Sequence, residues 1–215
     1  MTFFLYSLVA LPLWCAQFAL YFFLRRSRQM EESLIAKCAG SFLAVGSAGL
    51  ALALQGDNPL ARAVFWFFVL CTLADALLEL AFVPGMLVFG AGHVCLILWL
   101  WGLVTPSWWS LALWAGVYIL TALLFRRELP ALGGMTAPFL VYPALLGGSL
   151  ALGLPLVFLL GWKWWPVALG TLLFYISDMM VAKNQLSRWD DRWEKPIMAL
   201  YWAALYLISA GVWMA

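Results

Sequence analysis

Two acidic residues lie four positions apart near the end of a long apolar stretch of this chain. Asp75 and Glu79 belong to the segment 71–80, CTLADALLEL. Residues four apart share one face of a helix, so both carboxylates are expected to point the same way. A carboxylate within a hydrophobic helix is costly and normally faces a protein interior or a wet cavity. The pair therefore marks a candidate site, and other parts of the chain must supply its partners.

Five further polar residues interrupt apolar stretches in the same manner. They are Lys37, His93, Tyr142, Asp178 and Tyr201. Buried carboxylates beside a lysine or a histidine neutralise one another electrostatically, which makes such a cluster tolerable inside a membrane. We expect these residues to meet Asp75 and Glu79 at one depth.

The composition indicates an integral membrane protein made almost wholly of spans. Of the 215 residues, 66% are hydrophobic and 10% are charged, whereas soluble domains have about 25% charged residues. A net charge of +2 without a basic run argues against nucleic-acid binding. The single histidine and four isolated cysteines show no metal-ligand spacing, so no metal site and no cofactor are expected. The cysteines are Cys15, Cys38, Cys71 and Cys95.

The hydrophobic stretches predict an all-α bundle of eight transmembrane helices that forms a single domain over residues 1–215. The first stretch lacks a preceding basic region and is too long for a signal peptide, so it is expected to be a retained span. The expected spans are residues 3–24, 34–54, 61–80, 85–104, 107–125, 136–159, 166–182 and 197–213.

Basic residues predict the orientation of these spans. When the loops between consecutive spans are numbered in chain order, the odd-numbered loops hold nine arginines and lysines and the even-numbered loops hold two. The positive-inside rule therefore places the odd-numbered loops in the cytoplasm and both termini on the other side of a plasma (inner) membrane. With this orientation, most of the polar residues within the spans lie roughly 5–12 Å below the cytoplasmic helix ends. We expect a cavity open to the cytoplasmic leaflet.

Two patterns concern helix packing. Small residues recur every four positions in span 34–54, which allows close approach of another helix and predicts a central place for this span. These are Ala36, Gly40, Ala44 and Ala48. In addition, segments 73–78 and 176–181 are alike and lie four spans apart. A parallel repeat of two four-helix halves would explain this likeness.

Three motifs together resemble the YhhN family, which includes the eukaryotic lysoplasmalogenases. They are Gly90-Ala91-Gly92-His93, the segment 173–182 (LFYISDMMVA), and Asp75 followed by Leu77 and Leu78. The resemblance extends from about the second span to the end of the chain. It implies eight spans and hydrolysis of the vinyl ether of a lysoplasmalogen, giving a fatty aldehyde and a glycerophospho-alcohol. The implied partners are a lysophospholipid substrate and membrane lipid.

Vinyl ether hydrolysis requires a proton donor for the alkene carbon and a negative charge beside the resulting cation. Two carboxyl groups in unlike environments serve this need, and we assign Asp75 and Asp178 to the pair. His93 is the candidate for activating or relaying water. The remaining candidates would bind substrate or orient these groups. They are Lys37, Tyr142, Tyr201 and Glu79.

Two other functions are compatible with the same residues. Carboxylates, histidine and lysine within a bundle also form proton relays, which would fit a proton-coupled transporter of small molecules or lipids. A lipid-binding or scaffold protein without chemistry is the third interpretation. Ser177 is a weak candidate nucleophile, because no Gly-x-Ser-x-Gly elbow surrounds it.

Overall fold

The computed structural model describes residues 3–56, 58–187 and 193–214. Within these residues it is all-helical, without strands, which confirms the predicted fold class. The order of elements is α1 (Phe3–Arg26), α2 (Met30–Gln55), α3 (Pro59–Leu80), α4 (Phe82–Leu103), α5 (Trp108–Leu124), η1 (Leu129–Ala131), η2 (Gly133–Met135), α6 (Thr136–Gly153), α7 (Leu156–Leu159), η3 (Trp162–Trp164), α8 (Trp165–Ser187) and α9 (Glu194–Val212).

Seven helical segments of the described chain are long and apolar enough to cross a membrane. The short helix α7 continues the span that α6 begins, and together with η2 they cover Gly133–Leu159. Helix α5 is the remaining predicted span and has 17 residues. At 1.5 Å per residue it is about 25 Å long, at the lower limit for a transmembrane helix.

Several helices extend a few residues beyond the predicted spans, and α1, α2, α8 and α9 do so through charged residues at the basic loops. Helix α2 begins at Met30 rather than at residue 34, with Glu31 and Glu32 in its first turn, where acidic groups interact favourably with the helix dipole. Helix α8 continues to Ser187, so Lys183 belongs to the helix and not to the expected loop. Its amine pairs with Glu128 at 2.5 Å. Residues 188–192 of that expected loop lie outside the described residues.

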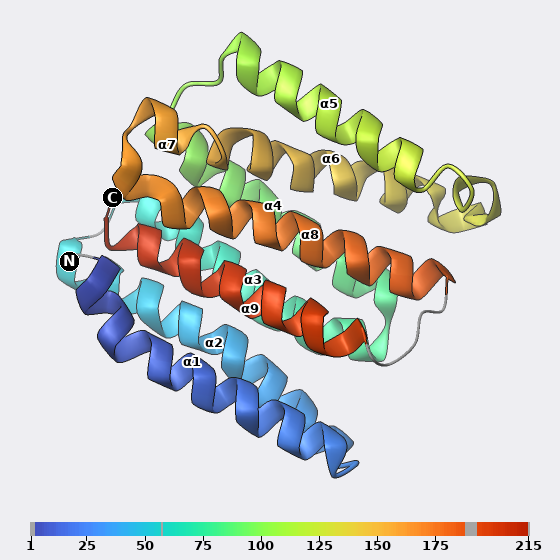
Figure 1. Cartoon of the computed structure of the whole chain (residues 1–215), viewed down its shortest axis with the longest axis horizontal. Helices are drawn as coiled ribbons and strands as arrows, with labels where there is room; N and C mark the ends of the chain where they lie inside the picture. Colours follow the sequence, from blue (N-terminus) through green and yellow to red (C-terminus); the bar gives the residue numbers. More distant parts are fainter. Residues whose placement is uncertain (1–2, 57, 188–192, 215) are drawn as a thin grey trace.

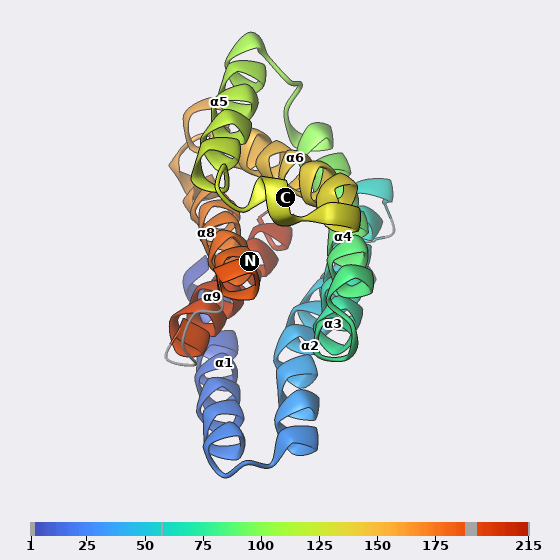
Figure 2. The same cartoon turned by 90° about the vertical axis from the view of Figure 1, so that its right-hand side faces the viewer.

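The spans form a ring with one helix outside it (Figures 1 and 2). Around the ring, the neighbours in contact are α1, α2, α3, α4, α6, α8 and α9, and α9 closes it by packing on α1 and α2. Helix α5 packs on α6, at the edge of the molecule farthest from α1 (Figure 1). This position leaves much of the surface of α5 exposed.

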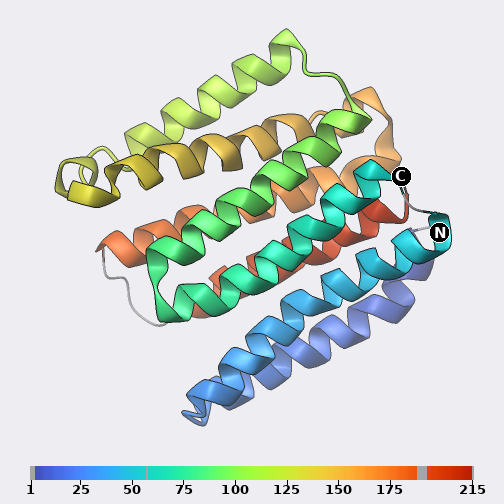
Figure 3. The ribbon, with the colours of Figure 1, turned by 180° about the vertical axis from the view of Figure 1, so that it is seen from behind.

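Spans that follow one another in the chain run in opposite directions, as Figure 3 shows from behind. Helices α1, α3, α5 and α8 therefore finish at the same end of the bundle, close to Arg25, Arg126 and Lys183. We refer to this as the basic end. The N and C termini both lie towards the opposite end (Figure 1).

The stripe of small residues on α2 does allow a close approach. Ala36, Gly40, Ala44 and Ala48 are all buried. At Gly40 the neighbour is Trp202 of α9, and a Cβ added there would lie 2.5 Å from Trp202 Cζ2. A central place was predicted for α2, but α9 is the most buried of the candidate spans, because it contacts α1, α2, α3 and α8.

The contacts between spans have the arrangement that a parallel repeat of two halves would give. If α1 to α4 correspond to α5, α6, α8 and α9, the packing of α4 on α6 corresponds to the packing of α9 on α2. The first helices differ, because α1 joins the ring and α5 lies outside it. The repeat remains a hypothesis that these contacts support.

Side chains close the bundle at the end opposite the basic end. Tyr6 Oη and Ser209 Oγ are 2.5 Å apart, and Tyr206 donates a hydrogen bond to Ser7 at 2.5 Å. Both bonds join α1 to α9. At the same end, Trp99 is buried and contacts the ring of Trp164. The opposite end is therefore filled by packed aromatic residues.

Candidate active site

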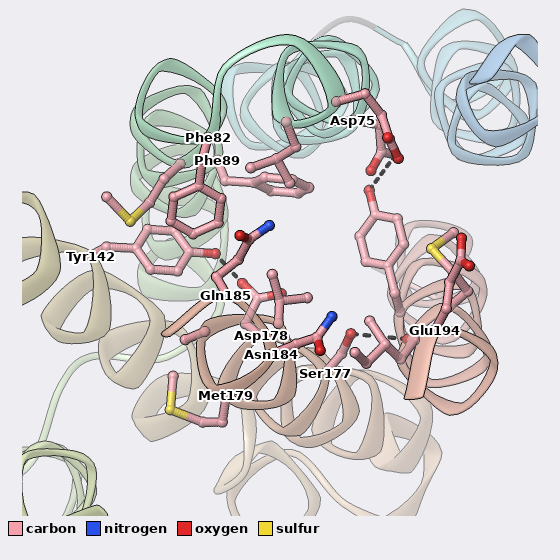
Figure 4. A pocket seen from close by; sticks show the side chains of 18 of the residues that line it. Asp75, Phe82, Phe89, Tyr142, Ser177, Asp178, Met179, Asn184, Gln185 and Glu194 are labelled. Atoms are coloured by element: carbon pink, nitrogen blue, oxygen red, sulfur yellow. Dashed lines mark hydrogen bonds between the residues drawn. The ribbon is translucent and has the colours of Figure 1, made fainter. Parts of the chain in front are cut away.

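A cavity of about 260 Å³ lies near the basic end of the bundle. Its wall is built from the last turns of α3 and α8 and the first turns of α4, α6 and α9, with contributions from α1, α2 and the end of α5. Figure 4 shows side chains from several of these elements facing one another. Six of the seven residues selected from the sequence line it. They are Lys37, Asp75, Glu79, Tyr142, Asp178 and Tyr201.

Asp75 has the larger set of partners of the two carboxyl groups. Its Oδ2 accepts hydrogen bonds from the Ser41 hydroxyl and from Tyr201 Oη, the latter at 2.8 Å. Its Oδ1 lies 3.9 Å from Lys37 Nζ. The residue is 2% exposed. One cation and two hydroxyl donors therefore surround this buried carboxyl group.

Lys37 joins Asp75 to Glu79. Its Nζ lies 3.2 Å from Glu79 Oε1. The side chain of Glu79 is 33% exposed, whereas that of Lys37 is 10% exposed. Glu79 lies one helical turn closer to the basic end than Asp75, as the four-residue spacing predicts. The lysine therefore connects the mouth of the cavity with its interior.

Asp178 has a different environment. Its Oδ2 accepts a hydrogen bond from Tyr142 Oη of α6. Within the described part of the chain, Asp178 forms no ion pair. The residue is half-buried, and Figure 4 shows it across the cavity from Asp75. The two carboxyl groups thus face one space from opposite walls with unlike partners.

His93 does not line the cavity, and the expectation that it would was wrong. Phe89, one turn earlier on α4, lines the cavity instead. His93 is fully buried against Phe174, at 4.8 Å between ring centroids, and against Tyr142, at 5.9 Å. Its Nδ1 lies 3.0 Å from Ser149 Oγ, and its Nε2 has no partner among the described residues.

Ser41 is a site residue that sequence reasoning missed. It lies four positions after Lys37 on α2, so the two share a helix face. The four-residue spacing that predicts a shared face for Asp75 and Glu79 also relates Ser41 to Lys37. This spacing is the signal by which Ser41 could be found from the sequence. The serine is fully buried and donates a hydrogen bond to Asp75.

Charged and polar residues at the mouth were also missed. Arg25 Nε lies 2.9 Å from Glu194 Oε1, and Tyr21 donates to the same oxygen at 2.6 Å. Asn184 and Gln185 line the cavity from the last turns of α8. The sequence predicts a loop at both positions, because the apolar pattern of that span ends before its helix does.

The residues around the cavity divide into two sides. Most of the charged groups belong to α1, α2, α3 and α9, on the side of Asp75. The other side, formed by α6, α8 and the end of α5, combines six apolar residues with neutral polar ones, namely Tyr142, Ser177, Asn184 and Gln185, around the single carboxyl group of Asp178. Its apolar members are Phe125, Phe139, Pro143, Met179, Val181 and Ala182. This arrangement suits an amphiphile with a charged and an apolar part.

Comparison with known proteins gives one match. A model of the YhhN family matches residues 32–212, which is most of the chain. Searches of curated proteins and of solved structures found no match to the chain. The two carboxyl groups, Lys37 and the tyrosines that contact the carboxyl groups all lie within the matched region.

Proposed function

The chain belongs to the YhhN family, and from that premise we propose that it is a membrane hydrolase acting on a lysolipid. The bond cleaved is the vinyl ether of a lysoplasmalogen, as the resemblance to the lysoplasmalogenases implies. The observation that carries the proposal is the pair of carboxyl groups, Asp75 and Asp178, which face one cavity with unlike partners. The expected products are a fatty aldehyde and a glycerophospho-alcohol.

The two sides of the cavity support one orientation of the lipid. The charged side near Lys37 and Arg25 accepts the headgroup phosphate, and the apolar side near Met179 and Phe139 accepts the start of the hydrocarbon chain. In a vinyl ether, the oxygen is on the glycerol side and the β carbon is on the chain side. Asp75 then lies beside the oxygen and the α carbon, and Asp178 beside the β carbon.

The first chemical step is proton transfer to carbon. Asp178 gives its proton to the β carbon, and the double-bond electrons form the new C–H bond, which leaves an oxocarbenium ion. The hydrogen bond from Tyr142 occupies one carboxyl oxygen, so the other is available to hold the proton. Asp75, ionised beside Lys37, stabilises the cation electrostatically.

The second step adds water and breaks the ether bond. Water attacks the α carbon, and its proton returns to Asp178, which restores the donor. The resulting hemiacetal breaks its bond to the glycerol oxygen while the proton of its hydroxyl moves to that oxygen. Aldehyde and alcohol leave, and one water is consumed. Because His93 does not line the cavity, we assign it no proton transfer to the substrate. We propose that it supports the position of Tyr142 by packing against that ring.

A proton-coupled transporter would need access from both faces, usually to a site near the midplane. The cavity instead lies near the basic end. At the opposite end, hydrogen bonds join α1 to α9, and the rings of two tryptophans pack together. The packing therefore favours the hydrolase. The basic end is the predicted cytoplasmic end, so the substrate is expected in the cytoplasmic leaflet.

The test compares two lipids with the same headgroup and chain length. Purified protein in detergent or vesicles receives either a lysoplasmalogen or the corresponding ester lysophospholipid, and released fatty aldehyde and fatty acid are measured. We expect aldehyde from the vinyl ether, no fatty acid from the ester, and neither product from the Asp75→Asn/Asp178→Asn variant. Absence of aldehyde with the wild-type protein, or aldehyde from the double variant at the wild-type rate, would contradict the proposal.

A further inference from the structure

A small apolar groove adjoins the cavity between α5 and α6. Its volume is about 20 Å³. It shares three lining residues with the cavity, namely Phe125, Phe139 and Pro143. The rest of its wall comes from α5, α6 and the turn that joins them. These residues are Tyr118, Thr121, Ala122, Leu129 and Leu140.

Two phenylalanine rings separate the groove from the cavity. The rings of Phe125 and Phe139 meet edge to face, with centroids 5.3 Å apart and an angle of 72° between their planes. Phe125 is 1% exposed and Phe139 is 6% exposed. On the outer side the groove reaches the surface of the bundle at Leu140, which is 43% exposed. The two rings, and on the outer side a hydrogen bond from Tyr118 Oη to the Leu140 carbonyl at 3.3 Å, close the path between the cavity and this surface.

The volume of the cavity limits what it can enclose. At about 260 Å³ it falls below the range of about 300–1,000 Å³ typical of pockets that enclose a drug-sized ligand. A long hydrocarbon chain therefore has to extend out of it. The mouth near Arg25, Glu79 and Glu194 carries charges, and covering those charges with an apolar chain would be unfavourable.

We propose that the groove between α5 and α6 is a lateral portal for the hydrocarbon chain of the lysolipid, with Phe125 and Phe139 as its gate. This inference rests on the proposed function, because it assigns a path to the chain of the same substrate. The occupant is a single chain, since the groove is narrow and its lining is mainly apolar. The groove also lies on the side of the cavity that holds Asp178, where the chain begins.

The position of α5 is consistent with this portal. Helix α5 lies outside the ring and packs mainly on α6 (Figure 2). A hydrogen bond between Thr121 Oγ1 and Tyr175 Oη, at 2.6 Å, ties it to α8. Lys183 Nζ lies 4.9 Å from the centroid of the Phe125 ring and contacts that ring from the side of α8. The gate is thus formed by two buried side chains close to the edge of the bundle, and one of them, Phe139, directly precedes the exposed Leu140.

A photolabelling experiment follows the chain without requiring hydrolysis. The probe is an ester lysophosphatidylethanolamine with a diazirine in the middle of its acyl chain, mixed into phosphatidylcholine vesicles that contain the full-length protein. After illumination, adducts are mapped by mass spectrometry. We expect them at Tyr118 and Leu140, and we expect excess lysolipid without the diazirine to compete them away. Adducts confined to other helices, or no competed adduct, would overturn the portal.

A substitution that narrows the groove gives an independent test. Ala122 lines the groove and not the cavity, so Ala122→Phe leaves the proposed catalytic groups in place. We expect it to raise KM for a long-chain lysoplasmalogen about tenfold, as displacement of a few methylene groups from an apolar surface would. A short-chain substrate, which ends before the gate, should be unaffected. Ala112→Phe on the exposed surface of α5 is the matched control.

The two experiments separate the portal from the proposed reaction. If competed adducts map to the groove but no aldehyde is formed from a vinyl ether, the portal stands and the proposed function fails. If aldehyde is formed but Ala122→Phe behaves like Ala112→Phe with both chain lengths, the portal is wrong and the hydrolase stands. Folding of both variants is checked by gel filtration and thermal unfolding.

Discussion

Asp178→Asn is the substitution that tests the proposed chemistry most directly. The amide has nearly the same shape as the carboxyl group, and its oxygen can still accept the hydrogen bond from Tyr142. Since no described cation pairs with Asp178, the change leaves no charge without its partner. The fold should keep its stability, because a carboxyl group inside the bundle is replaced by a neutral group that makes the same contact.

The expected loss of activity follows from the proposed role of Asp178 as proton donor. A positioned general acid typically accelerates a reaction by about 10²–10⁴-fold. At 1.36 kcal/mol for each factor of ten, this corresponds to about 3–5 kcal/mol of activation free energy. The loss should appear in kcat, because the amide side chain can still contact the bound lipid. Tyr142→Phe removes only the hydrogen bond and should cost less.

The assay measures fatty aldehyde from lysoplasmalogen, with binding of an ester lysolipid as a second readout. The β carbon of the vinyl ether becomes the carbon next to the carbonyl group of the aldehyde. In heavy water, protonation at this carbon therefore places one solvent deuterium there. A product without that deuterium would reject the protonation step. If Asp178→Asn keeps wild-type kcat while the deuterium is still incorporated, the proton comes from another group and the assignment of Asp178 is wrong.

Three further expectations concern the other carboxylate, the nearby serine and the topology. Asp75→Asn should abolish most activity and also lower thermal stability, because Lys37 then keeps only Glu79 as a counter-ion among the described residues. Adding Lys37→Met to this variant should restore thermal stability but not activity. Ser177→Ala should retain most activity, since Ser177 donates to the Ile197 carbonyl at 3.1 Å and no acyl-enzyme is needed; an inactive, folded variant would contradict this. A C-terminal reporter that functions only in the cytoplasm should be silent, because the positive-inside rule predicts that the C terminus lies on the other side. An active reporter would contradict the predicted orientation.

Hydropathy and helical spacing predicted much of the structure. Long apolar stretches must be helical in a membrane, where backbone groups find no water, so the spans were identified, with α5 the shortest. The spacing of Asp75 and Glu79 predicted a shared face, and both line the cavity. The excess of basic residues in alternate loops marked the end of the bundle where the cavity lies.

The remaining features depend on contacts between distant helices. His93 and Phe89 lie one turn apart on α4, and the rotation of α4 against α6 and α8 decides which of them faces the cavity. The same holds for α9, whose burial follows from closing the ring. A prediction from hydropathy also ends a helix at its last apolar residue. It therefore did not include the polar last turns of α8, which carry Asn184 and Gln185.

The contacts of the two carboxyl groups explain how a repeated framework could provide unlike groups. Asp75 on α3 accepts from Ser41 on α2, and Asp178 on α8 accepts from Tyr142 on α6. These are corresponding helices if the chain consists of two parallel halves. The difference comes from additional partners on one side, because among the described residues only Asp75 also meets a lysine from α2 and a tyrosine from α9. A proton donor and an ionised carboxylate would thus arise from one structural position, distinguished by Lys37 and Tyr201.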